Sequence, residues 1–356
     1  MNISLTRNDT ALLKGAAILA IVLHNFCHWI PGAVVENEYN FHAENARRLV
    51  DIIVSGGPHM VLNIFSHLGC YGVPVFLFLS GYGVVKKYEQ PAAAGQGAVP
   101  MWDFARYNAL KLWRLMLAGM ILLFIYETFF SSGWRHGVMN VVYMLTFVTN
   151  FFPQTGDTFL PKQDLLLGPW WYFSLTMQMY MLYRVCYYRR GDVPVAVSVA
   201  VCVILQVLAV TVWDSPKQEM LHYLRYTFLA CLLPFALGVW AARHTVRISA
   251  ALYVAAWVVF AGGCFNVFLW ILSPAALVVI VMPLVRLARR AVRFPLEWTG
   301  GISAALFVVH PVVRCFLNPR TAENIYITIS EYLAVSIIAA WALTAFLKYI
   351  PGPRLR

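Results

Sequence analysis

Long apolar runs with few charges recur along the whole of this 356-residue chain, and no other feature limits its possible folds as much. A run of about 18 or more such residues can cross a bilayer as a helix. Charged residues make up 12% of the chain, about half the fraction found in an average soluble protein. The sequence therefore predicts an all-α, polytopic membrane protein.

We expect about ten transmembrane helices, with boundaries good to several residues: 10–30, 68–86, 109–131, 168–188, 192–213, 221–242, 248–263, 264–285, 300–318 and 327–350. A further apolar stretch, 138–152, has about 15 residues. That length is short for a span and typical of a re-entrant or interfacial segment.

The distribution of basic residues favours ten crossings with both termini in the cytoplasm. Cytoplasmic loops of membrane proteins carry an excess of Lys and Arg. If 138–152 does not cross, 19 of the 27 Lys and Arg residues fall on the cytoplasmic side. If it crosses, the basic loop 286–293 lies on the opposite side from Lys86 and Lys87. The first arrangement also explains the net charge of +11 without a nucleic-acid partner.

The whole chain, 1–356, reads as one integral membrane domain without an appended soluble domain. We find no internal repeat, and the first apolar run has no cleavage site after it, so we expect it to remain as a span. The seven cysteines are scattered singly, so the sequence predicts neither a disulfide framework nor a metal site. No bound cofactor is expected.

The first apolar run, 11–30, carries three ionisable side chains, Lys14, His24 and His28. A charged group at that depth costs about 2.5–3.5 kcal/mol on insertion scales, so such residues often serve a function. A neutral imidazole can accept and return a proton near pH 7, which makes His24 the first candidate base. Two alternatives stay open: His24 can bond to a neighbouring helix, and Lys14 can extend to the membrane surface. Taken alone, His28 lies near the outer interface and favours packing.

Other polar residues allow two interpretations each. Ser80 and Gly81 lie in a continuous apolar helix, where small residues favour close helix packing over nucleophilic catalysis. His310 lies in the middle of a span. It is either a second site residue or a packing residue that forms a hydrogen bond to another helix. Trp171 and its neighbours are expected to be interfacial anchors, with stacking on a sugar ring as the alternative.

Five segments, in this order, resemble the acyltransferase-3 family of membrane acyltransferases: KGAAILAIVLHN, VPVFLFLSGYGVVKKYE, FARYNALKLWRLM, GPWWYFSLTMQMYMLYRV and GGISAALFVVHPVV. Together they extend from residue 11 to about residue 313. Members of this family are multi-pass proteins that move acyl groups, typically acetyl, from acyl-CoA to sugars of surface polysaccharides. Five motifs in the right order are a strong signal.

The resemblance implies roles for particular residues. Lys14 and His24 correspond to the family's basic residue and the histidine proposed as its general base. Lys111 and Arg114 correspond to the paired basic residues on the cytoplasmic side, where the phosphates of CoA would bind. His310 corresponds to the late histidine and is a candidate second catalytic residue.

The spacing departs from the family pattern, with nine residues instead of ten between Lys14 and His24. At 100° per residue this turns His24 about 80° away from Lys14 on the helix. The helix can bulge locally, the two residues need not share a face, or Asn25 and His28 can share the site. Arg106 is a further candidate for donor binding because it lies on the cytoplasmic side.

The resemblance implies an O-acyltransferase that passes acetyl or another short acyl group from cytosolic acyl-CoA, with acetyl-CoA as the expected donor. The acceptor would be a hydroxyl of a lipid-linked or cell-surface glycan, and the location a bacterial plasma membrane. The enzyme would reach this acceptor itself, as a monomer or homo-oligomer, or with a separate partner protein. The alternative is a glycan or lipid transporter, or flippase, that uses the same intramembrane residues as a pathway.

Overall fold

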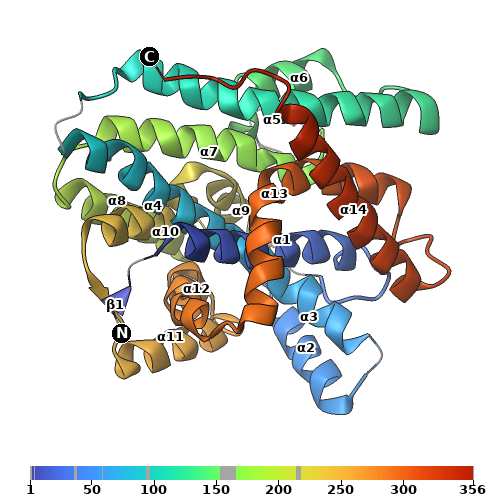
Figure 1. The fold of residues 1–356 in the computed structure, drawn as a ribbon. Helices are drawn as coiled ribbons and strands as arrows, with labels where there is room; N and C mark the ends of the chain where they lie inside the picture. Colours follow the sequence, from blue (N-terminus) through green and yellow to red (C-terminus); the bar gives the residue numbers. More distant parts are fainter. Residues whose placement is uncertain are drawn as a thin grey trace.

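The computed structural model describes residues 2–3, 5–35, 38–57, 59–93, 97–152, 166–213 and 218–355. It is 78% helical, and its only sheet among these residues has two short strands, which confirms the all-α prediction (Figure 1). The segment between the predicted spans 68–86 and 109–131, and the segment between 109–131 and 168–188, lie partly outside the described residues.

Among the described residues, the N-terminal half contains strand β1 (Asn2–Ile3), seven α-helices and three 3₁₀ turns. The elements in chain order are α1 (Arg7–Cys27), α2 (Ala43–Ser55), α3 (Met60–Leu68), η1 (Gly69–Tyr71), α4 (Gly72–Ala93), α5 (Met101–Phe130), α6 (Val138–Leu145), η2 (Thr149–Phe151), η3 (Gly168–Trp170) and α7 (Trp171–Leu182). A π-helical turn, η4 (Tyr183–Tyr187), extends α7.

The C-terminal half follows with seven more α-helices and one strand. These elements are α8 (Val193–Thr211), α9 (Glu219–Tyr226), α10 (Phe228–Arg243), β2 (Val246–Arg247), α11 (Ala250–Gly263), α12 (Val267–Leu287), α13 (Arg290–Phe316) and α14 (Ile325–Leu347). Helix α13 begins ten residues before the predicted span 300–318, so most of the basic loop 286–293 is helical. The charged first turns of α13 are stabilised by Arg293, whose guanidinium lies 2.5 Å from Asp9 and 2.6 Å from Glu297.

Seven helices in the described part of the chain are long and apolar enough to cross a membrane, and α9 with α10, bent by 47°, makes an eighth. The predicted spans 168–188 and 248–263 coincide with α7–η4 and the 14-residue α11, which are shorter than that criterion. Ten crossings with cytoplasmic termini therefore stay a prediction. Helix α6 has eight residues, about 12 Å of rise, which is too short to cross a bilayer.

Two close helix crossings hold the centre of the molecule together. Helix α1 packs on α13, and α4 packs on α10 (Figure 1). A Cβ added to Gly15 or Gly300 would lie 1.9 Å from a carbonyl oxygen of the facing helix. Gly81 and Gly238 are equally close across the second crossing, at 2.1 and 2.0 Å. The backbones therefore touch at these four glycines, which confirms the packing interpretation of Gly81.

Contacts between distant segments hold both chain ends against the helix bundle. Strand β1 pairs antiparallel with β2, which joins the N-terminus to the segment after α10. The Arg114 guanidinium donates to the carbonyl of Ile350 at 2.7 Å, which holds the C-terminal segment against α5. The predicted arrangement, in which both termini and the basic loops share one side, stays a prediction.

Candidate active site

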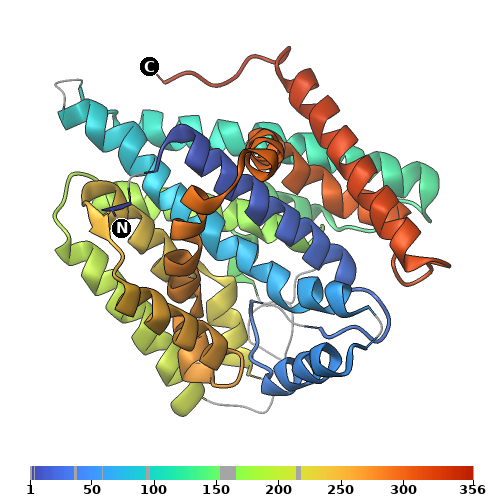
Figure 2. The ribbon, with the colours of Figure 1, turned by 60° about the horizontal axis from the view of Figure 1, so that its bottom comes forward.

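The first cavity, which we call the outer cavity, has a volume of about 230 Å³ and contains His24. Helices α1, α7 and α13 line it, together with the segment that follows α1. Helix α4, which contributes Val73, lies beside α1 in Figure 2. The lining residues are Ile21, His24, Asn25, His28, Trp29, Glu38, Tyr39, Val73, Gly168, Pro169, Trp171, Tyr172, Tyr226, Phe307 and Arg314.

His24 is held in one tautomer by the backbone of α3. Its Nδ1 lies 2.9 Å from the carbonyl oxygen of Ser66, and a carbonyl oxygen can only accept a hydrogen bond. Nδ1 therefore carries the proton, and Nε2 has the lone pair that a general base needs. The ring is buried because the turn beside it has no side chain: a Cβ on Gly69 would lie 2.7 Å from the Cβ of His24.

Three further polar side chains, those of Asn25, His28 and Arg314, line the outer cavity with His24. The ring of His28 lies 5.2 Å from that of His24, centroid to centroid. Arg314 donates to the backbone carbonyl of Asn25 at 2.9 Å, and its guanidinium lies 4.8 Å from the centre of the Trp29 ring. The outer cavity thus combines a base, a second imidazole and a cation.

Glu38 brings a carboxyl group into the same cavity from the segment between α1 and α2. This segment is held by Arg225, whose Nε donates to the carbonyl of Glu38 at 2.5 Å, and by Tyr39, which packs 4.6 Å from Tyr226. Burial raises the pKa of the Glu38 carboxyl to about 7, because desolvation disfavours its charged form.

The second cavity, which we call the inner cavity, has a volume of about 180 Å³ and contains Lys14, Ser80 and Lys111. The remaining lining residues are Ile21, Val73, Phe76, Leu112, Leu115, Tyr172, Phe173, Thr176, Tyr180, Ser303, Ala304 and Phe307. Neither lysine has an acidic partner within ion-pair distance among the described residues. Both ammonium groups are therefore available to an anionic ligand.

The two cavities adjoin, because Ile21, Val73, Tyr172 and Phe307 line both of them. We call these four side chains the partition. Helix α1 is continuous from Arg7 to Cys27 and contains no bulge. This excludes the first of the three options, a local bulge. Lys14 and His24 line different cavities, so they need not share a face, and Asn25 and His28 line the outer cavity together with His24.

Three predicted site residues lie outside both cavities. Arg106 is exposed on α5, and Arg114 holds the C-terminal segment instead of lining the inner cavity. His310 is fully buried, with its Nδ1 3.0 Å from the carbonyl of Leu306 one turn earlier. Its Nε2 has no hydrogen-bond partner among the described residues.

The prediction that Trp171 and its neighbours are interfacial anchors is wrong. Trp170 and Trp171 are 1% and 3% exposed, because they pack inside the helix bundle. Trp171 instead lines the outer cavity and meets the ring of Tyr39 edge-on at 5.5 Å. Trp171 and His24 line the same cavity, so the second interpretation, in which Trp171 contacts a sugar ring, remains a proposal.

A family model described as an acyltransferase domain, that of the acyltransferase-3 family, matches residues 9–347. The chain belongs to this family. The match covers nearly the whole chain and includes both cavities, so this protein is a membrane acyltransferase. No curated protein and no solved structure matches it significantly. Among the described residues, no group of three or more His, Cys, Asp and Glu side chains could hold a metal ion.

Proposed function

We propose that this acyltransferase moves a short acyl group, with acetyl-CoA as donor, to a glycan hydroxyl with His24 as general base. One observation carries the proposal. The unpaired lysines and the candidate base lie in two cavities that share a partition. Lys14 and His24 are ten residues apart on one helix, which corresponds to a rise of about 15 Å. The extended pantetheine arm of CoA is long enough to cover that distance.

In the inner cavity, Lys14 and Lys111 would bind phosphate groups of the donor. A cation near a phosphate forms a charge-assisted hydrogen bond, which is stronger than a neutral one. The thioester would then pass between the partition side chains towards His24. Ile21, Val73 and Phe307 are apolar and close together, so the proposal favours a small acyl group over a long one.

In the outer cavity, Nε2 of His24 would accept the proton of the acceptor hydroxyl as its oxygen attacks the thioester carbonyl. The carbon–sulfur bond of the tetrahedral intermediate then breaks, and the imidazolium returns the proton to the CoA thiolate. Arg314 supplies a positive charge near the developing oxyanion, where such a charge stabilises the transition state most. The products are free CoA and the acyl ester.

His28, Glu38 and Trp171 would contact the acceptor. Carboxyl and imidazole groups accept hydrogen bonds from sugar hydroxyls, and an indole face can pack against a sugar ring. All three line the outer cavity beside His24. This arrangement supports a glycan acceptor at the end of the path opposite to the donor.

The proposal is tested with the purified protein, labelled acetyl-CoA and a glycan extract from the cell envelope. We expect release of CoA and transfer of label to the glycan. Lys111→Gln should raise the KM for acetyl-CoA about tenfold with little change in kcat. Tenfold is about 1.4 kcal/mol, just below the usual range for a hydrogen bond to a charged group, because Lys111 is exposed.

Lys348→Gln is the matched control, because Lys348 is an exposed lysine outside both cavities. Its KM should stay within a factor of two of the wild-type value. An absence of CoA release with every glycan fraction would rule out the proposal. CoA-independent movement of glycan across proteoliposomes would support the transporter alternative instead.

A further inference from the structure

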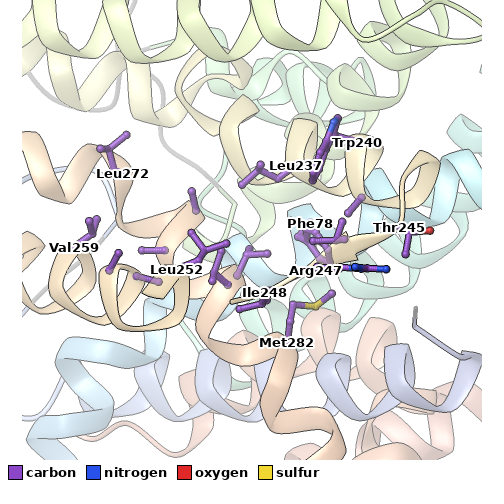
Figure 3. Close-up of a pocket in the computed structure, with 18 residues that line it drawn as sticks. Phe78, Leu237, Trp240, Thr245, Arg247, Ile248, Leu252, Val259, Leu272 and Met282 are labelled. Atoms are coloured by element: carbon purple, nitrogen blue, oxygen red, sulfur yellow. The ribbon is translucent and has the colours of Figure 1, made fainter. Parts of the chain in front are cut away.

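A third cavity, larger than the other two, lies between α4, α10, α11 and α12 and is not used by the proposed reaction (Figure 3). Its volume is about 490 Å³, which is within the range of small-molecule sites. Of the 18 residues that line it, all except Thr245 and Arg247 are apolar. We call it the apolar groove.

The two polar side chains lie together at one end of the apolar groove. Figure 3 shows Thr245 and Arg247 at one end, and Val259 and Leu272 at the other. Leu252, which lines the groove between them, is 45% exposed, so the groove opens to the outside of the helix bundle. Helix α11 is one of the ten expected crossings, and in that arrangement this surface would face lipid. The groove therefore has a polar head end and a long apolar body open to the bilayer.

Arg247 has no acidic partner among the described residues, unlike its neighbours Arg243 and His244. Arg243 pairs with Glu89 at 2.7 Å, and His244 lies 2.7 Å from Asp192. No acidic group among the described residues lies within ion-pair distance of Arg247. The backbone of Arg247 is fixed by the pairing of β2 with β1, so the uncompensated charge stays at the end of the groove.

We propose that the apolar groove binds an anionic phospholipid, with its phosphate at Arg247 and one acyl chain along α10, α11 and α12. The uncompensated cation selects a negative headgroup, and a basic pocket between helices at the membrane surface is a recurring form of lipid site. The apolar body excludes a small soluble anion as occupant, because such an ion would leave most of the groove unfilled. This inference is independent of the proposed acyl transfer.

The test measures which lipids stay bound to the full-length purified protein, by native mass spectrometry after exchange into equal amounts of phosphatidylglycerol and phosphatidylcholine. The wild-type protein should retain phosphatidylglycerol preferentially. Arg247→Gln should reduce that preference about fivefold, the effect of one cation near an anionic surface. Arg190→Gln, at an exposed arginine outside the groove, should leave the preference unchanged.

A second pair of variants tests the apolar body of the groove. Ala255→Trp places a large side chain in the groove from an exposed position on α11, so it should reduce lipid retention without unfolding the protein. Ala251→Trp, one turn earlier, is exposed and outside the groove, so it is the matched control. Equal retention by these two variants, or no headgroup preference in the wild type, would overturn the proposal.

Discussion

At the scale of single residues, the candidate base depends on one hydrogen bond and one missing side chain. The Ser66 carbonyl fixes the proton of His24 on Nδ1, and Gly69 leaves room for the ring beside α3. The Ser66 carbonyl belongs to the backbone and Gly69 has no side chain, so no side-chain motif in the sequence predicts either contact. Lys14 and Lys111 face the inner cavity, where we propose that the donor binds.

Glu38 gives a prediction about pH. Its pKa is raised to about 7 by burial, so the folded protein holds a proton that the unfolded chain releases above its ordinary carboxyl pKa. The wild type should therefore lose stability as the pH rises from about 4.5 through 7. Glu38→Gln removes this loss. Its Tm should match the wild-type Tm at pH 4 and exceed it at pH 8, and a Tm difference independent of pH would contradict the prediction.

The sequence identified those candidate site residues that stand out from their immediate neighbours along the chain. An ionisable side chain inside an apolar run is visible in the sequence, and His24, Lys14 and Lys111 were found in this way or by motif. Glu38 was missed because it lies in the loop after the predicted span 10–30, and Arg314 because it lies near the outer end of the predicted span 300–318; a charge costs little at either place. Only contacts across the fold bring them in: Arg225 binds the carbonyl of Glu38 from 187 residues away.

At the scale of helices, the close glycine crossings decide which faces of α1 and α4 reach the cavities. Gly15 and Gly300 press α1 against α13, and this contact fixes the rotation of α1 about its axis. Lys14, next to Gly15, then faces the inner cavity, and His24 faces the outer one. The rotation of a helix about its axis depends on such contacts. The sequence pattern alone therefore left three explanations open for the spacing of Lys14 and His24.

Two neighbouring glycines of α13 allow a matched test of this crossing. A side chain at Gly300 would meet the backbone of Ala11, whereas nothing lies within 4 Å of the Cβ position at Gly301. Overpacking of this kind costs about 1–3 kcal/mol. Gly300→Val should therefore lower the Tm of the detergent-solubilised protein by several degrees, while Gly301→Val should change it little. Equal shifts for both variants would contradict the packing described above.

At the scale of the whole molecule, the remaining prediction is the path through the membrane. Within the described part of the chain, seven or eight helices are long and apolar enough to cross a membrane, and α7–η4 and α11 would complete ten crossings. A hydropathy pattern does not show that α7–η4 and α11 are short, because the ends of a helix depend on tertiary contacts. The pairing of β1 with β2 and the contact of Arg114 with Ile350 hold the two chain ends in place, but they do not assign a side of the membrane.

Thiol labelling of intact cells tests this path. Arg354→Cys lies in the C-terminal segment predicted to be cytoplasmic, and Asp51→Cys lies on α2, predicted to be outside; both positions are exposed. A membrane-impermeant maleimide should label the Cys at 51 in intact cells and the Cys at 354 only after permeabilisation. The wild type, whose described cysteines are at most partly exposed, provides the background. Labelling of both positions in intact cells would contradict ten crossings.

The most direct test of the central claim is the rate of acyl transfer from labelled acetyl-CoA by His24→Gln. Gln can hydrogen-bond but cannot accept the hydroxyl proton, so kcat should fall by at least about a hundredfold. The amount of protein in the membrane should stay unchanged. His67→Gln, at a buried histidine of α3 outside both cavities, should keep kcat within a factor of about three. Near-wild-type transfer by His24→Gln would show that another residue is the base.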